Sequence, residues 1–141
     1  MNTSNLDILF LSVPVLDLQY PPSSAAVLKA CVKQAGYSAC VIDTNILLKD
    51  ICKDDFTSVS NEFETISKGN VKDNLVESLF DNHCTLVQQW IDTVIDDIRE
   101  KNPRWLGISI FSYKSHKAAL LVALTVRQQF PNIKIVVGGR G

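Results

Sequence analysis

The chain has 141 residues, a formal net charge of -1, 21% charged residues and 46% hydrophobic residues, as expected for one soluble globular domain. This balance argues against a nucleic-acid-binding protein, which would carry a basic surface, and against a disordered chain. No apolar run approaches the roughly 20 residues of a membrane span, and residues 1–5 lack the basic start of a signal peptide. We therefore expect a cytoplasmic protein with neither a nucleic-acid nor a membrane partner.

The first part of the chain predicts a strand, a helix and a second strand. Residues 7–13 form a nearly continuous apolar run that ends at Pro14, as in a central parallel strand. The serines at 23–24 are candidate caps of a helix that Gly36 ends. Its predicted apolar face contains Leu28, Cys31, Val32 and Ala35. Residues 39–43 predict the second strand. The end of that strand carries Asp43, Thr44 and Asn45.

Residues 46–83 have a less regular pattern and predict a helical insertion with amphipathic pieces at 61–68 and 71–80. The insertion leaves from the carboxyl end of the second strand. It is therefore expected to be a lid or partner surface at the ligand edge, or a helical pair that covers apolar sheet surface. Residues 85–101 predict the clearest helix of the chain. Its apolar face contains Val87, Trp90, Ile91, Val94, Ile95 and Ile98.

The C-terminal third predicts strand, helix and strand. Residues 105–111 form a short apolar strand, Ser115 is a candidate N-cap of the following helix, and residues 133–137 form a β-branched strand. We interpret Trp90 and Trp105 as core residues. The alternation of strands and helices predicts an α/β fold, an open doubly wound parallel sheet of flavodoxin-like order 2-1-3-4.

In such a sheet the carboxyl ends of the strands share one edge, and ligands bind at that edge. The loop at 13–22 would then face the loop at 109–114 across a crevice. Gly138 and Gly139 follow the last strand. Their missing side chains would let a flat or phosphate-bearing ligand approach the backbone, although a simple turn explains a glycine pair equally well.

Several familiar ligand sites lack their sequence signatures. There is no G-x-G-x-x-G and no G-x-x-x-x-G-K-[ST], so a dinucleotide site and a P-loop are disfavoured. The first loop has no Ser/Thr/Gly-rich grip for flavin mononucleotide, and the strand ends lack the carboxylate cluster of a phosphorylated receiver. Cys31, Cys40, Cys52 and Cys84 have no metal-ligand spacing, so we expect reduced, mostly buried thiols.

Several segments carry a resemblance that spans the whole chain. They are Tyr20-Pro21-Pro22, Ala25-Ala26-Val27-Leu28, Ala35-Gly36-Tyr37, Val41-Ile42-Asp43-Thr44-Asn45, Gly107-Ile108-Ser109-Ile110-Phe111-Ser112 and Ile135-Val136-Val137-Gly138-Gly139. In this order and spacing they resemble the N-terminal cobalamin (B12)-binding domain of B12-dependent radical SAM enzymes. The resemblance implies cobalamin as cofactor and methyl transfer or related radical chemistry in another domain.

By this resemblance, Ser109 and Phe111 occupy the family's S-x-[L/F] position, and the glycine pair lies near the nucleotide tail. The loop at 15–23 would line the lower face of the corrin. Tyr20 and Tyr113 could pack on a ring system, and Arg140 could pair with a phosphate. The candidate cofactor-binding residues are Val15, Leu16, Asp17, Tyr20, Pro21, Pro22, Ser109, Phe111, Ser112, Tyr113, Gly138, Gly139 and Arg140.

The chain departs from the family pattern in three places. The D-x-H-x-x-G segment with the lower axial histidine is absent, and Asp17-Leu18-Gln19 stands in that loop. His116 lies close to the proposed site and could touch a ligand, but we interpret it and His83 as surface or capping residues. The radical SAM motif C-x-x-x-C-x-x-C and a fifth strand are also missing. We therefore expect the N-terminal fragment of a longer protein, catalytically inactive by itself.

The expected partner is a C-terminal radical SAM domain that would hold a 4Fe-4S cluster and S-adenosylmethionine. The sequence does not identify its small-molecule or peptide substrate. A different class of function stays open. In that alternative the domain binds no cobalamin and serves as a structural or substrate-docking module, with the 46–83 insertion as its contact surface.

Overall fold

The structure is a computed structural model and describes residues 5–19, 23–68 and 83–139. The candidate residues Tyr20, Pro21, Pro22 and Arg140 lie outside the described residues, as does the predicted piece 71–80. With β for strands, α for α-helices and η for short 3₁₀ helices, the elements are β1 (Ile8–Ser12), α1 (Ser23–Gln34), β2 (Ala39–Asp43), α2 (Thr44–Cys52), η1 (Lys53–Asp55), α3 (Phe56–Lys68), α5 (Cys84–Lys101), β3 (Trp105–Ile110), η2 (Tyr113–Ser115), α6 (His116–Gln129) and β4 (Lys134–Gly139).

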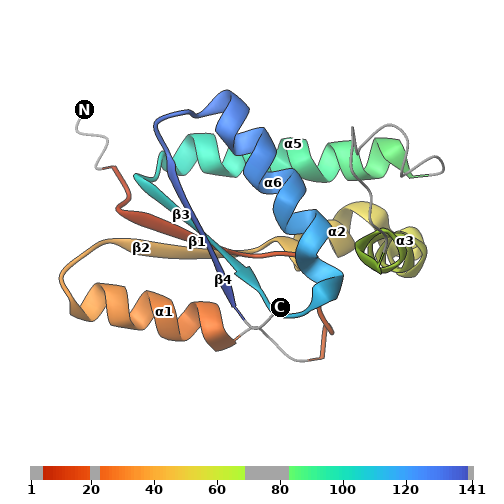
Figure 1. The fold of residues 1–141 in the computed structure, drawn as a ribbon, viewed down its shortest axis with the longest axis horizontal. Helices are drawn as coiled ribbons and strands as arrows, with labels where there is room; N and C mark the ends of the chain where they lie inside the picture. Colours follow the sequence, from red (N-terminus) through yellow and green to blue (C-terminus); the bar gives the residue numbers. More distant parts are fainter. Residues whose placement is uncertain (1–4, 20–22, 69–82, 140–141) are drawn as a thin grey trace.

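The four strands form one sheet in the order β2-β1-β3-β4, and all neighbouring strands are parallel. The helix α1 lies on one face, whereas α5 and α6 lie on the other (Figure 1). The side of each helix follows from right-handed crossovers, because β1 to β2 moves one way along the sheet and the later connections move the other way. The predicted open doubly wound, flavodoxin-like sheet is confirmed.

The face under α5 and α6 forms the main hydrophobic core. All six residues predicted for the apolar side of α5 are buried. Trp90 is fully buried, its ring meets Phe63 edge to face, and its indole N–H donates to the Thr44 carbonyl at 2.8 Å. That bond satisfies the one polar group of the ring, so burial of this large side chain leaves no unpaired donor. The prediction that Trp90 is a core residue is confirmed.

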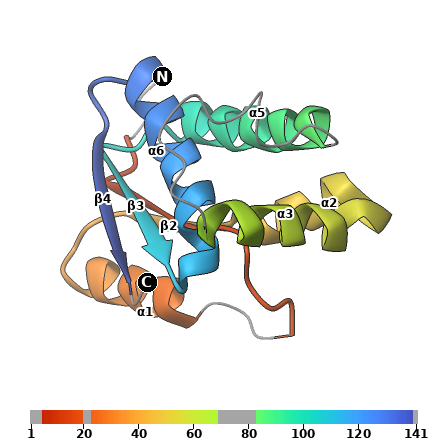
Figure 2. The same ribbon diagram turned by 45° about the vertical axis from the view of Figure 1, so that its right-hand side comes forward.

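The face under α1 is only partly covered, and the predictions for four residues fail there. Ala25 is the buried residue of α1, whereas Leu28 is 46% exposed and Cys31 and Ala35 are exposed. Trp105 is 39% exposed and is therefore not a core residue. The reason is geometric, because α1 packs on β1 and β2. No other described helix lies on that face of the sheet (Figure 2). Of the four cysteines, Cys52 alone is fully buried, so the expectation of mostly buried thiols is wrong.

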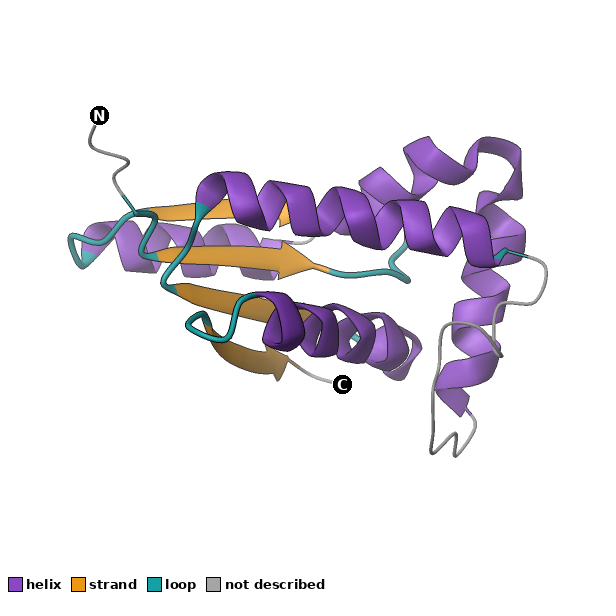
Figure 3. Cartoon of the chain, turned by 90° about the horizontal axis from the view of Figure 1, so that it is seen from above, coloured by secondary structure: helices purple, strands orange, loops and turns teal. Residues whose placement is uncertain are grey.

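The insertion contains α2 and α3, which lie beyond the carboxyl ends of the strands (Figure 3). It begins at Thr44, two residues earlier than predicted, because the Asp43 carboxylate caps α2 by accepting from the Asn45 and Ile46 amides at 3.0 and 3.2 Å. Its residues Leu48, Val59, Phe63 and Ile66 join the main core. The insertion therefore covers apolar surface and also stands at the expected ligand edge.

The glycine pair is part of β4 and not a turn after it. Gly139 has a φ of +134°, and a Cβ atom there would lie 1.9 Å from the Ile110 carbonyl oxygen. Gly138 differs, because a Cβ atom at that position would meet nothing within 4 Å. Gly139 is thus required by the backbone, whereas Gly138 faces open space.

Candidate ligand site at the carboxyl edge

A row of small residues crosses the carboxyl end of the sheet. Ser12 pairs in register with Asp43 on one side and with Ser109 on the other, and Ser109 pairs with Gly138. Residues in register on neighbouring parallel strands point to the same face, so the four positions form one line on the face of α1. The line carries short polar side chains and ends in a glycine. At the glycine end of the row, an added Cβ atom on Gly138 would meet nothing within 4 Å, so space is open there.

Two hydroxyl groups lie in this row, one of them buried and the other half-buried. Ser12 is 1% exposed, and its Oγ atom has no hydrogen-bond partner among the described residues. The Ser109 Oγ atom lies 3.4 Å from Ser24 Oγ of α1, a contact at the long end of the hydrogen-bond range. Buried polar atoms are nearly always paired in native proteins. The unpaired Ser12 hydroxyl, with Ser109 between it and the open Gly138 position, makes this row a candidate binding site.

The loop after β1 is held by the start of α2. Asn45 accepts from the Leu16 amide at 3.3 Å and donates to the Leu16 carbonyl at 3.1 Å, so one buried side chain fixes both backbone groups. Thr44 donates to the Ser12 carbonyl at 2.7 Å. The sequence showed polar residues at the end of the second strand but gave them no role. Their place directly after a buried strand was the usable signal.

Of the predicted residues in this loop, Val15 and Leu16 are half-buried and Asp17 is exposed. The Asp17 carboxylate accepts from the Gln19 amide at 2.9 Å and so shapes the loop locally. Ser115, predicted as an N-cap, stands before α6 but makes no side-chain cap. Its hydroxyl instead donates to the Val13 carbonyl at 3.4 Å and so links the loop after β3 to the loop after β1.

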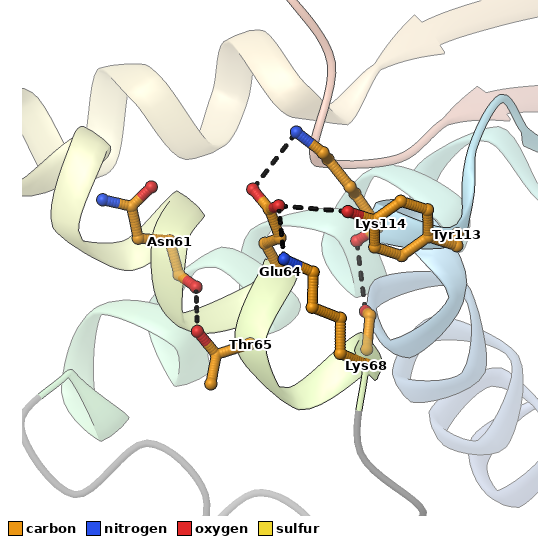
Figure 4. Close-up of polar contacts among 7 residues, drawn as sticks. Asn61, Glu64, Thr65, Lys68, Tyr113 and Lys114 are labelled. Carbon is orange, nitrogen blue, oxygen red and sulfur yellow. Dashed lines mark hydrogen bonds and ion pairs between the residues drawn. The ribbon is translucent and has the colours of Figure 1, made fainter.

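The loop after β3 carries Phe111, Ser112 and Tyr113. Phe111 is 67% exposed, Tyr113 is 41% exposed and Ser112 is half-buried. Tyr113 and Lys114 contact the insertion through Glu64 of α3 (Figure 4). Sequence reasoning missed Glu64, because it lies 49 residues before Tyr113 and no local pattern links the two.

Three donors surround the Glu64 carboxylate. Lys68 and Lys114 each place an ammonium nitrogen 3.1 Å from it, and the Tyr113 hydroxyl donates at 3.1 Å. Hydrogen bonding from Lys68, then from Lys114 and Tyr113, lowers the pKa of Glu64 to about 2. The pKa of Lys68 is raised, chiefly by its hydrogen bond to Glu64. The Glu64 carboxylate is therefore ionised at neutral pH, and its contacts fix the loop to the insertion.

A second hollow, of about 370 Å³, lies at the opposite, amino ends of the strands. It is lined by Asp7, Ile8, Val32, Tyr37, Arg104 and Trp105. Its carboxylate, Asp7, already accepts from the Ser38 amide at 2.8 Å and the Ser38 hydroxyl at 2.9 Å, and these bonds lower the pKa of Asp7. Ligands of open α/β sheets bind outside the carboxyl ends. The Ser12 row, with its unpaired hydroxyl, is therefore the better candidate.

The two histidines lie away from the Ser12 row. His116 is exposed at the start of α6, and the His83 ring contacts the Glu62 carboxylate. Within residues 5–19, 23–68 and 83–139, no group of three or more His, Cys, Asp or Glu side chains is arranged to hold a metal ion. The same described part of the chain contains no helix with the length and apolar character of a membrane span.

Comparisons of this chain with protein-family models, with curated proteins and with solved structures found no match. The resemblance to cobalamin-binding domains therefore stays a prediction from the residues.

Proposed function

We propose that this domain is a cobalamin-binding module for radical SAM chemistry, with the cofactor held at the carboxyl edge of the sheet. The observation that carries the proposal is the row Ser12, Ser109 and Gly138, in which Ser109 stands between an unpaired buried hydroxyl and a position without a side chain. A ribose and phosphate tail needs this combination of hydrogen-bonding groups and close backbone approach. The resemblance of the sequence supplies the identity of the ligand.

The residues present fit the cofactor in three ways. Ser12 and Ser109 offer hydroxyl groups to a polar tail, and Gly138 leaves it room. Leu16, held at both backbone groups by Asn45, offers an apolar cover for the lower corrin face in place of an imidazole. When bound, cobalamin supplies a cobalt centre that carries a methyl group or takes part in radical chemistry. The partner domain would supply the cluster that cleaves S-adenosylmethionine.

The test is a titration of the 141-residue chain with hydroxocobalamin, followed by visible absorbance. We expect a saturable spectral change, and Gly138→Leu should weaken binding at least about tenfold because the side chain enters the open space beside Ser109. Val137→Leu is the matched control, since it enlarges the neighbouring side chain on the opposite face of the same strand. Gly139 is unsuitable, because substitution there collides with the Ile110 backbone. No spectral change in the unaltered chain would refute the proposal.

The competing proposal is a structural or substrate-docking module without cobalamin. It is favoured by the apolar side chains that remain exposed on and around the α1 face, among them Val27, Leu28, Tyr37, Trp105 and Val136. Surfaces of this kind mark interaction sites when they are contiguous. A chain that ignores hydroxocobalamin but binds a separately produced radical SAM domain, and loses that binding on Trp105→Glu, would support this second function.

A further inference from the structure

The insertion helix α3 contacts the loop after β3 through residues on two successive helical turns. Glu64 accepts from the Tyr113 hydroxyl and pairs with Lys114, both in η2. One turn further along, the Ser67 hydroxyl donates to the Lys114 carbonyl at 3.2 Å. Figure 4 shows these side chains converging between the two elements. The short helix η2 is thus tied to α3 both by its side chains and by a backbone carbonyl.

The helix that presents Glu64 is itself rigidly placed. Val59, Phe63 and Ile66 of α3 are buried in the main core, whereas Glu64 lies on the side turned to η2. A group on a packed helix holds its partner more accurately than a group on a loop can. Lys68 adds a second contact, because its ammonium lies 5.9 Å from the centre of the Tyr113 ring. Tyr113 is therefore fixed at its hydroxyl and over its ring.

We propose that Glu64 is a positioning residue for the ligand site. Through Tyr113 and Lys114 it sets the conformation of the 111–115 loop at the carboxyl edge, so that the insertion determines how tightly the site holds its ligand. The inference deepens the proposed cobalamin function and rests on it for the identity of the ligand. Glu64 does not itself touch the ligand in this proposal.

The charges of the cluster support this role. The groups that face Glu64 are Lys68 from its own helix, and Lys114 and Tyr113 from η2. One ionised carboxylate separates two ammonium groups, which would otherwise repel each other. A neutral glutamine could still accept from Tyr113 but could not offset the two positive charges. Glu64→Gln should therefore disturb the loop relative to the unaltered chain, but less than Glu64→Ala does.

The first measurement is hydroxocobalamin affinity of the full chain and its variants. We expect Glu64→Ala to raise Kd about tenfold and Glu64→Gln to raise it by less. Thr65→Ala is the matched control, because Thr65 lies on the exposed side of α3 and its hydroxyl donates within the helix to the Asn61 carbonyl, so every contact of Glu64 remains; its Kd should change less than twofold. If Glu64 acts through Tyr113, Glu64→Ala should have a much smaller effect when added to Tyr113→Phe. If Glu64→Ala raises Kd by the same factor in the unaltered chain and in Tyr113→Phe, the proposal is overturned, whether or not Tm changes.

The second measurement needs no ligand and separates the two proposals. Amide hydrogen exchange in the ligand-free chain should become faster at residues 111–116 in Glu64→Ala, while the strands keep their protection. If the unaltered chain fails to bind cobalamin, the proposed function fails, but this exchange pattern would still support positioning of the loop by Glu64. Unchanged exchange at 111–116 in Glu64→Ala would overturn the positioning role whatever the chain binds.

Discussion

The two faces of the sheet differ in how completely helices cover them. Under α5 and α6, apolar residues of α2, α3, α5 and α6 close one continuous core, which includes Trp90 and Phe63. Under α1 the sheet is only half covered, so Trp105 and Val136 remain exposed. The packed face fixes the fold, and the open face leaves space next to the row of Ser12, Ser109 and Gly138. The main core and the proposed ligand site thus lie on opposite sides of the same strands.

The largest test of this difference compares the two tryptophans. Trp90→Ala should lower the free energy of unfolding by about 3–5 kcal/mol, because it leaves a cavity in the packed core and removes the donor to Thr44. Trp105→Ala should cost roughly 1 kcal/mol or less, since it loses surface packing and the Lys134 ammonium over its ring. Urea unfolding measures both variants. Similar losses for the two would show that the α1 face is as tightly built as the other.

The glycine pair gives the next largest effect. Gly139→Ala should cost roughly 1–3 kcal/mol, because its positive φ disfavours a side chain and the Cβ atom collides with the Ile110 carbonyl. Gly138→Ala should change stability by about 0.5 kcal/mol or less, since its Cβ atom meets open space. Thermal unfolding of both variants is the measurement. A larger loss at Gly138 than at Gly139 would contradict the assignment of Gly138 to the ligand and Gly139 to the backbone.

A smaller effect is expected at Gly107, on the α1 face of β3. An added Cβ atom would lie 2.7 Å from the Phe10 ring, so Gly107→Ala should cost about 1 kcal/mol as the ring shifts. Phe10→Leu removes the ring, and in that background Gly107→Ala should cost clearly less. Chemical unfolding of the four proteins of this cycle gives the coupling. Additive losses would mean that Phe10 does not limit the residue at 107.

The smallest expected effect concerns pH. Because the folded-state pKa of Glu64 is depressed to about 2, its contribution is fully present above the ordinary pKa of a glutamate and is lost as pH falls through about 2. The tie between α3 and η2 should therefore persist at about pH 4, where an ordinary glutamate begins to protonate. A carboxyl titration by nuclear magnetic resonance checks this. Titration of Glu64 at the ordinary value would show that Lys68, Lys114 and Tyr113 do not hold it in solution.

The order of strands and helices, and the apolar side of α5, could be predicted from the sequence alone. Local periodicity decides which residues share one side of a helix, and the buried strands were marked by short apolar runs. Right-handed crossovers then left few possible arrangements, so the sheet order 2-1-3-4 was also within reach. The row of Ser109 and Gly138 followed from that order, because parallel strands end along the same edge.

The tertiary structure decided what periodicity cannot. Leu28 and Cys31 share a stripe of α1, but burial needs a second surface opposite the stripe, and the described residues supply it only at Ala25. The two glycines are alike in sequence, and only the Ile110 carbonyl beside one of them separates their roles. Glu64 meets Tyr113 across 49 residues because α3 packs into the core. Such contacts depend on where distant elements dock, and no local pattern encodes that.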